Sequence, residues 1–427
     1  MTRKFLILVF MLANLLSAQD NTLVTRLRTL PDVVEVLPTR FDSTFFTVAY
    51  RLRVRQPVDH SNPKGKSFLQ SVYVYHRDYD KPVVYVTEGY ASRGIQGPAE
   101  LTSLLHGNQI VVEHRYFGDS RPDSLEWKYL TTGQAADDHH RITLLMKSIY
   151  HGKWVSTGIS KGGQTTLFYR YYFPNDVDAS VPYVAPVNLS QEDPRILKFL
   201  RTVGTAEIRE RIKQFQIALL KREKEILPII DDMAKKKGYT FSIGKSLAYE
   251  YSVLEFPCGF WQYGHSPEEI PPLEAPPDSL LNALDRIASL FYYSDRGIEM
   301  YEPFQYQAYT EIGYYGYDIS DFKPYLIAVK DPTNKILAPK NTELRFNPNV
   351  MYNVYNWLRD HGTNILYIYG ETDLWGATAI ELSGKTNAVK IVKPAGSHTT
   401  RIANLPSWQK EIVYSTLEQW LGLTLAR

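Results

Sequence analysis

A serine lies between two glycines in segment 158–162, which reads Gly-Ile-Ser-Lys-Gly and fits the pattern G-x-S-x-G. The segment follows a short apolar run at 154–155 and precedes a helix-like run at 163–173. A strand, a sharp turn and a helix in this order form the nucleophile elbow of a serine hydrolase, which exposes the serine hydroxyl above a sheet. Glycine and serine strings also occur in ordinary strand-to-helix turns, which is the alternative. The flanking pattern favours the elbow, and we predict that Ser160 is a nucleophile.

A serine hydroxyl is a poor nucleophile at neutral pH, so it needs a neighbouring base. In hydrolases with this elbow the chain order is serine, then acid, then histidine. Only His265, His361 and His398 follow Ser160. His265 lies in a region without strand patterns, and His361 lies at a predicted helix end. His398 follows the strand-like run 389–392, so we predict that it is the base, with a structural loop histidine as the alternative.

The base needs an acid that orients it, and this acid should also follow a strand. Asp373 does so, because it comes shortly after the apolar run 365–369. Glu371 lies two residues nearer the strand and is the competing candidate. We predict Asp373 as the acid that fixes the tautomer of His398.

A tetrahedral intermediate needs backbone N–H donors for its oxyanion. In this class of hydrolase one donor is the residue after the nucleophile, which here is Lys161, and the other comes from the loop after an earlier strand. That loop is 88–91, Glu-Gly-Tyr-Ala, and we predict Tyr90 as the second donor.

The elements that must position these residues alternate between strands and helices. Strand patterns occur at 48–54, 71–75, 82–87, 109–112 and 177–187, and an amphipathic helix pattern at 131–150. Short β-branched runs of this kind are typical of a mostly parallel sheet covered by helices on both faces. We therefore predict the α/β-hydrolase fold.

The pattern changes near residue 188, where long charged helical runs replace the strands. The runs 207–233 and 279–291 and the proline cluster 267–277 predict a helical cap inserted into the core. Strand patterns return at 364–369 and 389–392, and a last helix is predicted at 407–421. The predicted organisation is a signal segment at 1–18, core at 35–187, cap at 188–348 and core again at 349–427.

Composition limits the possible partners and compartment. The chain has 427 residues, a net charge of +2 and one cysteine, Cys258, so we expect no nucleic-acid partner and no intrachain disulfide. Residues 1–18 have a charged start, an apolar middle and a small-residue end, which is typical of a secretory signal. We expect export to the periplasm or beyond, without stable membrane insertion once the signal is removed; an N-terminal anchor is the alternative. The oligomeric state stays open.

Segment 137–140, Asp-Asp-His-His, contains residue types that bind metals. Adjacent positions of a helix point in different directions, and no zinc-type spacing accompanies them. We predict neither a metal nor a cofactor.

Segment 113–118, Glu-His-Arg-Tyr-Phe-Gly, resembles the Glu-His-Arg-Tyr-Tyr-Gly string of prolylcarboxypeptidase and dipeptidyl peptidase II. The Ala-Pro-Val at 185–187 and the surroundings of Asp373 and His398 are similar too. Lys161 replaces a tyrosine of those enzymes, and the Ser-Lys-Gly-Gly elbow is more similar to secreted bacterial tripeptidyl aminopeptidases. The resemblance covers about 47–187 and 364–420. It implies the same triad, a peptidase, and release of short, often proline-containing N-terminal units.

An enzyme of this kind must capture a free α-ammonium group, for which a desolvated carboxylate is the natural partner. Glu88 and Glu113 end strands near the expected site, so either is a candidate, with structural ion pairs to Arg93 or Arg115 as the alternative. A carboxypeptidase would need a cation instead, from Lys161 or Arg115. An esterase or lipase, and a catalytically inactive binding module, are the other functions left open.

Overall fold

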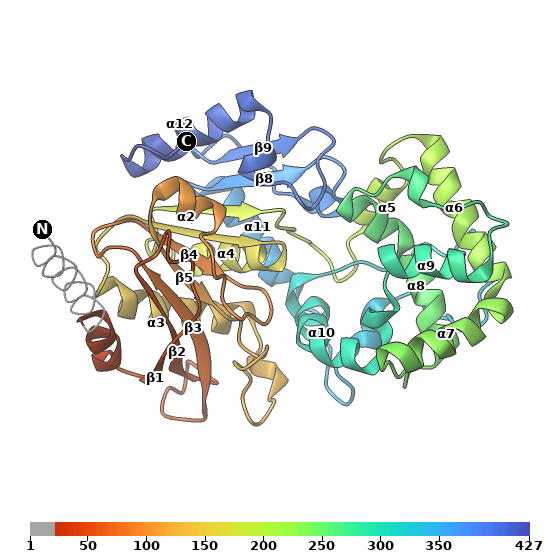
Figure 1. The fold of residues 1–427 in the computed structure, drawn as a ribbon, viewed down its shortest axis with the longest axis horizontal. Helices are drawn as coiled ribbons and strands as arrows, with labels where there is room; N and C mark the ends of the chain where they lie inside the picture. Colours follow the sequence, from red (N-terminus) through yellow and green to blue (C-terminus); the bar gives the residue numbers. More distant parts are fainter. Residues whose placement is uncertain (1–21) are drawn as a thin grey trace, which may run out of the picture.

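The computed structural model describes residues 22–427, so the predicted signal segment 1–18 lies outside the described residues. Figure 1 shows two bodies next to each other: a sheet with helices around it, and a body built only of helices. The first contains both ends of the described chain, and the second contains its middle.

Within the described residues, nine strands form one sheet in the order β1-β2-β3-β5-β4-β6-β7-β8-β9. The strands that pair antiparallel are β1 (Val33–Pro38), β2 (Val48–Pro57), β3 (Ser67–His76) and, against β3, β5 (Asn108–Val112). The parallel part continues from β5 through β4 (Val83–Thr87), β6 (Trp154–Ile159), β7 (Ala179–Tyr183), β8 (Leu366–Gly370) and β9 (Val389–Lys393). Because parallel strands end at the same edge, the loops after β4, β6, β8 and β9 open on one side.

Side chains of each strand alternate between the two faces of the sheet. In β4, Val84 and Val86 pack in the core that includes α2 (Glu100–Leu105) and α12 (Ser407–Leu421), whereas Val83 and Tyr85 pack in the core that includes α3 (Thr132–Lys147). Both α4 (Lys161–Tyr172) and α11 (Pro348–Asp360) are packed together beside β8 on that second face. The predicted α/β fold with a mostly parallel sheet between helices is thus confirmed.

The helical body, called the cap below, lies between β7 and α11 in the chain. Its helices are α5 (Pro194–Leu200), α6 (Ala206–Lys221), α7 (Glu223–Lys237), α8 (Lys245–Tyr263), α9 (Pro277–Ile287) and α10 (Asp295–Gln307). It has an apolar core of its own, which includes Phe215, Leu219, Phe256 and Leu284. No helix among the described residues is both long enough and apolar enough to cross a bilayer.

Two local predictions differ from the structure. The run 207–233 forms two helices rather than one, because Arg222 leaves helical geometry (φ −102°, ψ 16°) and donates a hydrogen bond to the carbonyl oxygen of Ala275 at 2.6 Å. Strand β1 was not predicted from the sequence. Its run Val-Val-Glu-Val-Leu-Pro is apolar, but most of these side chains are exposed at the edge of the sheet.

Candidate active site

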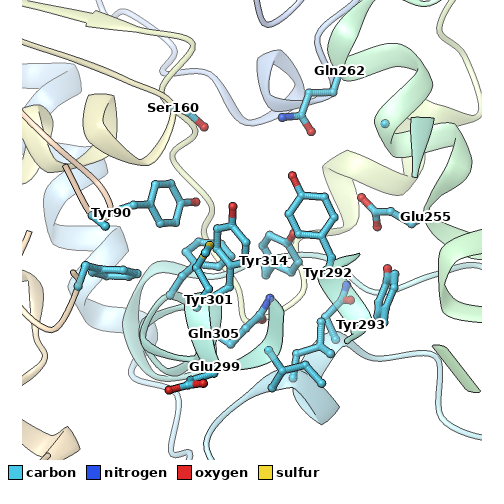
Figure 2. A pocket seen from close by; sticks show the side chains of 18 of the residues that line it. Tyr90, Ser160, Glu255, Gln262, Tyr292, Tyr293, Glu299, Tyr301, Gln305 and Tyr314 are labelled. Carbon is cyan, nitrogen blue, oxygen red and sulfur yellow. The ribbon is translucent and has the colours of Figure 1, made fainter. Parts of the chain in front are cut away.

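Ser160 stands on a strained turn between β6 and α4. Its backbone has φ 57° and ψ −122°, a region that residues with a side chain rarely adopt. The turn needs its glycines, because a Cβ on Gly158 would lie 2.2 Å from the carbonyl oxygen of Gly162, and one on Gly162 would lie 2.7 Å from that of Thr87. This is the geometry of a nucleophile elbow. Figure 2 shows the Ser160 hydroxyl directed into a cavity.

Asp373 and His398 come from the loops after β8 and β9 and meet next to this turn. The Nδ1–H of His398 donates to Oδ2 of Asp373 at 2.8 Å, and the N–H of Trp375 donates to Oδ1 at 3.2 Å. Burial raises the pKa of the Asp373 carboxyl, while the bonds from His398 and Trp375 act in the opposite direction. Ser160 and His398 line the same cavity. The structure therefore brings the three predicted residues to one place, although no direct Ser160–His398 hydrogen bond joins them within the described residues.

The cap holds the histidine loop from the other side. The N–H of His398 donates to the carbonyl oxygen of Gln262 at 2.7 Å, at the C-terminal end of α8. The ring of Tyr263 meets the imidazole edge-on, with ring centroids 6.1 Å apart. The position of the base thus depends on the cap as well as on the sheet.

The two predicted oxyanion donors lie next to each other. The backbone of Gly89 lies in close contact with the elbow. A Cβ on Gly89 would lie 2.6 Å from the backbone nitrogen of Gly162 and 2.7 Å from the carbonyl carbon of Lys161. The carbonyl oxygen of Tyr90 accepts a hydrogen bond from the N–H of His114 at 3.2 Å, which fixes this loop. No acceptor is recorded among the described residues for the N–H of Tyr90 or of Lys161. Both N–H groups are available to a bound oxyanion.

The cavity has a volume of about 750 Å³ and lies between the sheet edge and the cap. Ser160 and His398 belong to its core side, and aromatic side chains form a large part of its remaining wall. The aromatic lining residues are Tyr90, Tyr116, Phe117, Tyr263, Tyr292, Tyr293, Tyr301, Phe304, Tyr314, Tyr315 and Trp375. Such a wall suits apolar and cyclic side chains and excludes water from the reacting group.

Two carboxylates of the cap line this aromatic space, the exposed Glu299 of α10 and Glu255. Glu255 of α8 accepts hydrogen bonds from the hydroxyls of Tyr315, at 2.7 Å, and Tyr317, at 2.6 Å, and burial raises its pKa to about 7. No cation pairs with it within the described part of the chain. Figure 2 shows Ser160 and Glu255 on different sides of the cavity. The cavity therefore has Ser160 and His398 on the core side and, on the cap side, a buried carboxylate without a cation.

Glu113 and Arg115, both predicted to contact substrate, do not line the cavity, and both are buried. Glu113 accepts hydrogen bonds from Ser92 N–H, at 2.9 Å, and Ser120 Oγ, at 2.5 Å, so it links the two loops that contain these serines. Arg115 donates to both carboxylate oxygens of Asp138, at 2.6 and 2.8 Å, and to three backbone carbonyls. The pair that forms is thus Arg115 with Asp138, not Arg115 with Glu113.

Glu88 is also absent from the cavity lining. Its carboxylate is half-buried beside the hydroxyl of Ser92, at 3.4 Å, and burial raises its pKa to about 7. The acid that the cavity presents comes from the cap instead.

The Arg115–Asp138 pair makes a prediction about stability. Replacing Arg115 with methionine leaves a buried carboxylate without its partner, which costs about 3–5 kcal/mol in the free energy of unfolding. The exposed pair between Arg201 and Asp318 is the control, and Arg201→Met should cost less than about 1 kcal/mol. Denaturant unfolding followed by circular dichroism measures both. Equal losses would contradict the structural role of Arg115.

Asp138, His139 and His140 of segment 137–140 have separate partners. Asp138 pairs with Arg115 and with Nε2 of His60, at 2.7 Å. His139 contacts the hydroxyl of Tyr85 through Nδ1 at 3.1 Å, and Nδ1 of His140 bonds Asp176 at 2.7 Å. These four neighbours in sequence do not converge on a point.

Glu255 and its two tyrosine donors were missed by sequence reasoning. One signal was present: Glu255 is an acidic residue within the apolar run 253–260 of α8. A charge in such a run indicates either a buried ion pair or a site. The tyrosines that bind it lie about 60 positions further along the chain, at 315 and 317, so no local pattern connects them.

The chain is similar to known proteins over most of its length. A family model described as PS-10 peptidase S37 matches residues 23–427. The chain is 33% identical over 378 residues to the prolyl tri/tetrapeptidyl aminopeptidase of Streptomyces mobaraensis, which covers 86% of this chain and 79% of that protein. It is 27% identical over 163 residues to the serine protease vicPb of Bipolaris victoriae strain FI3, which covers 32% of this chain and 30% of that one.

Among solved structures, the proline iminopeptidase of Mycobacterium smegmatis superposes with a TM-score of 0.42 and 13% identity. The match covers 86% of this chain and 98% of that one.

Proposed function

Because the chain belongs to the PS-10 peptidase S37 family, and is therefore a serine peptidase, we propose that it releases short peptides from free N-termini through Ser160. The observation that carries this proposal is Glu255, an unpaired carboxylate in the same aromatic cavity as Ser160 and His398. A free α-ammonium group pairs strongly with a carboxylate that is removed from water. With its N-terminus at Glu255, a peptide extends across the cavity toward Ser160.

In the proposed reaction, Ser160 Oγ attacks the carbonyl carbon of the scissile bond while His398 Nε2 takes the hydroxyl proton. The N–H groups of Lys161 and Tyr90 stabilise the oxyanion. His398 then protonates the leaving amine, and water hydrolyses the acyl-enzyme by the same route. Asp373 keeps the proton of His398 on Nδ1 and stabilises the imidazolium.

The distance between the ammonium site and the nucleophile sets the length of the released unit. The name of the Streptomyces mobaraensis relative specifies prolyl tri- and tetrapeptides. We propose a tripeptide unit with a proline preference for this chain, since the aromatic wall offers flat faces for a proline ring. Mass spectrometry of products from a peptide library measures both, and release of single residues or of dipeptides would contradict the tripeptide length.

The other functions have less support in this cavity. A C-terminal exopeptidase needs a cation for the terminal carboxylate. Arg121 and Arg296 line the cavity, and Arg121 lies 3.9 Å from Glu302. The buried charge on the cap side is acidic, however, and Arg115 pairs with Asp138. An esterase has no use for the unpaired Glu255. A catalytically inactive binding module does not explain the hydrogen bond between Asp373 and His398 beside a strained serine.

Replacing Glu255 with glutamine tests the proposal, because the amide keeps the size of the side chain and removes its charge. For peptides with a free N-terminus we expect kcat/KM to fall about 100-fold, as for the loss of one partner of a desolvated charge pair. For an ester without an amine we expect a change of less than threefold. Steady-state kinetics on matched free and N-acetylated substrates separate the two effects.

The matched control is Glu299→Gln, which removes an exposed carboxylate from the rim of the same cavity. We expect it to change kcat/KM by less than threefold on either substrate. Equal losses of Glu255→Gln on amine and ester substrates would refute ammonium recognition by Glu255.

The signal-like segment 1–18 supports the further proposal that the enzyme is exported and acts on extracytoplasmic peptides. Cell fractionation with sequencing of the mature N-terminus tests this. An intact N-terminus on a cytoplasmic protein would contradict it.

A further inference from the structure

Lys161, the residue after the nucleophile, carries an ammonium group in an unusual environment. The side chain is 4% exposed, and its Nζ lies 5.6 Å from the ring centroid of Tyr90 and 5.3 Å from that of Phe117. No carboxylate pairs with it within the part of the chain that the structure describes. Two aromatic rings are thus the main partners of a buried cation, an arrangement that stabilises charge less than a carboxylate does.

The charges around Lys161 do not compensate its own. The ionisable groups that face it are His114, in the loop after β5, and His139 of α3; burial lowers the pKa of both, and the charge of Lys161 acts in the same direction. Asp138 of α3 pairs with Arg115 and His60. Burial lowers the pKa of Lys161 itself to about 7. Perturbed pKa values of this kind cluster at functional sites.

The contact between Lys161 and Tyr90 joins the two predicted oxyanion donors. Each residue contributes a backbone N–H to the oxyanion site, and the side chain of one lies against the ring of the other. The Tyr90 ring also packs on Phe117, Tyr301 and Phe304, with centroid distances of 5.5, 5.7 and 5.8 Å. Lys161 therefore links the elbow to the loop that closes the oxyanion site and, through it, to α10 of the cap.

We propose that the protonated side chain of Lys161 is a positioning element of the oxyanion site: it holds Tyr90 in place and adds positive potential beside the developing oxyanion. The proposal rests on Ser160 being the nucleophile. It does not depend on recognition of an N-terminus, because the oxyanion forms with any acyl substrate. Acylation should therefore be faster when Lys161 is charged than when it is neutral.

The pH dependence expected for acylation follows from the charge state of Lys161. Lys161 carries its charge below its pKa of about 7 and loses it above. The acylation rate should therefore fall as pH rises through about 7. Glu255 has the opposite effect on peptide binding, since its carboxylate charges as pH rises. An ester without an amine does not use Glu255 and isolates the lysine.

The experiment is the pre-steady-state acylation burst with p-nitrophenyl acetate between pH 5.5 and 9. We expect the wild-type burst rate to decline on the alkaline side. Lys161→Met should lower it about 10- to 100-fold at pH 6, less than the 10²–10³ that the loss of an oxyanion donor typically costs, and should abolish the alkaline decline. Lys161→Arg, which stays charged, should keep most of the rate and lose the decline.

Lys221→Met is the matched control, because Nζ of Lys221 also lies over a tyrosine ring, that of Tyr325 at 5.1 Å, but in the cap. It should leave the burst and its pH profile unchanged. The melting temperature of Lys161→Met should equal or exceed that of the wild type, since a buried unpaired charge is removed.

A wild-type burst rate that does not decline above pH 7 would overturn the proposal without any variant. A Lys161→Met burst within twofold of wild type, or one with the same alkaline decline, would also overturn it. Failure of the nucleophile assignment is distinguished by Ser160→Ala, which would then still show a burst.

Discussion

Replacement of Ser160 with alanine is expected to lower kcat for peptide hydrolysis by about 10⁶-fold, to the residual rate that binding and the oxyanion site provide. The expectation follows from the backbone of the residue. A serine at φ 57° and ψ −122° costs of order 1–3 kcal/mol in strain, which persists only where the fold over-determines it. Here the strain directs the hydroxyl into the cavity that also contains His398.

A fluorophosphonate probe provides the direct measurement. Wild-type enzyme should be labelled on Ser160, as located by mass spectrometry, and Ser160→Ala should not be labelled. Alanine removes only the hydroxyl, so the variant should melt within a few degrees of wild type and should still bind substrate. The surface variant Ser415→Ala should be labelled like the wild type. Labelling that survives Ser160→Ala would identify another residue as the nucleophile.

The sheet and the approximate place of the site could be predicted from the sequence because they follow from local patterns. Strands β4, β6, β8 and β9 are short and rich in β-branched and aromatic residues, the first three are almost fully buried, and parallel strands end at one edge. Residues placed just after these strands, such as Ser160, Asp373 and His398, must then come close together. Their roles in the reaction stay predictions until the variants are measured.

The substrate side of the site could not be predicted in this way. Glu113 and Arg115 also follow a strand, but the loop after β5 directs both side chains into the protein interior. There Glu113 bonds Ser92 and Ser120, and Arg115 bonds Asp138. A sequence shows that a charge follows a strand and not whether its side chain faces a cavity or the core. Glu255 depends on how α8 packs against residues about 60 positions away, which is a long-range property of the cap.

The cap also explains why the geometry of the triad is not a property of the sheet alone. Trp375, two residues after Asp373, packs against Tyr314 and Tyr315, with centroid distances of 5.6 and 5.5 Å. Tyr315 in turn donates to Glu255. The acid loop and the proposed ammonium site therefore share one aromatic cluster, and the histidine loop bonds the end of α8.

The second large effect is expected at Asp373. Asp373→Asn keeps the size of the side chain but loses the acceptor that fixes the proton of His398 on Nδ1 and the charge that stabilises the imidazolium. In a serine–histidine–aspartate triad this substitution lowers kcat about 10⁴-fold with little change in geometry. We expect a loss of this size in kcat, with KM changed less than threefold, because Asp373 is buried behind His398 and does not line the cavity.

Glu371 supplies the matched control, because it lies two residues away on the same loop and was the competing acid. Its Oε2 accepts a hydrogen bond from the N–H of Ala395 at 2.7 Å, and no contact with His398 is recorded in the described residues. Glu371→Gln keeps an acceptor for that bond and should change kcat less than about threefold. A 10⁴-fold loss in Glu371→Gln with a small loss in Asp373→Asn would reverse the assignment. Small losses in both would mean that His398 needs no acid partner, and that its buried contact with Asp373 only holds the loop in place.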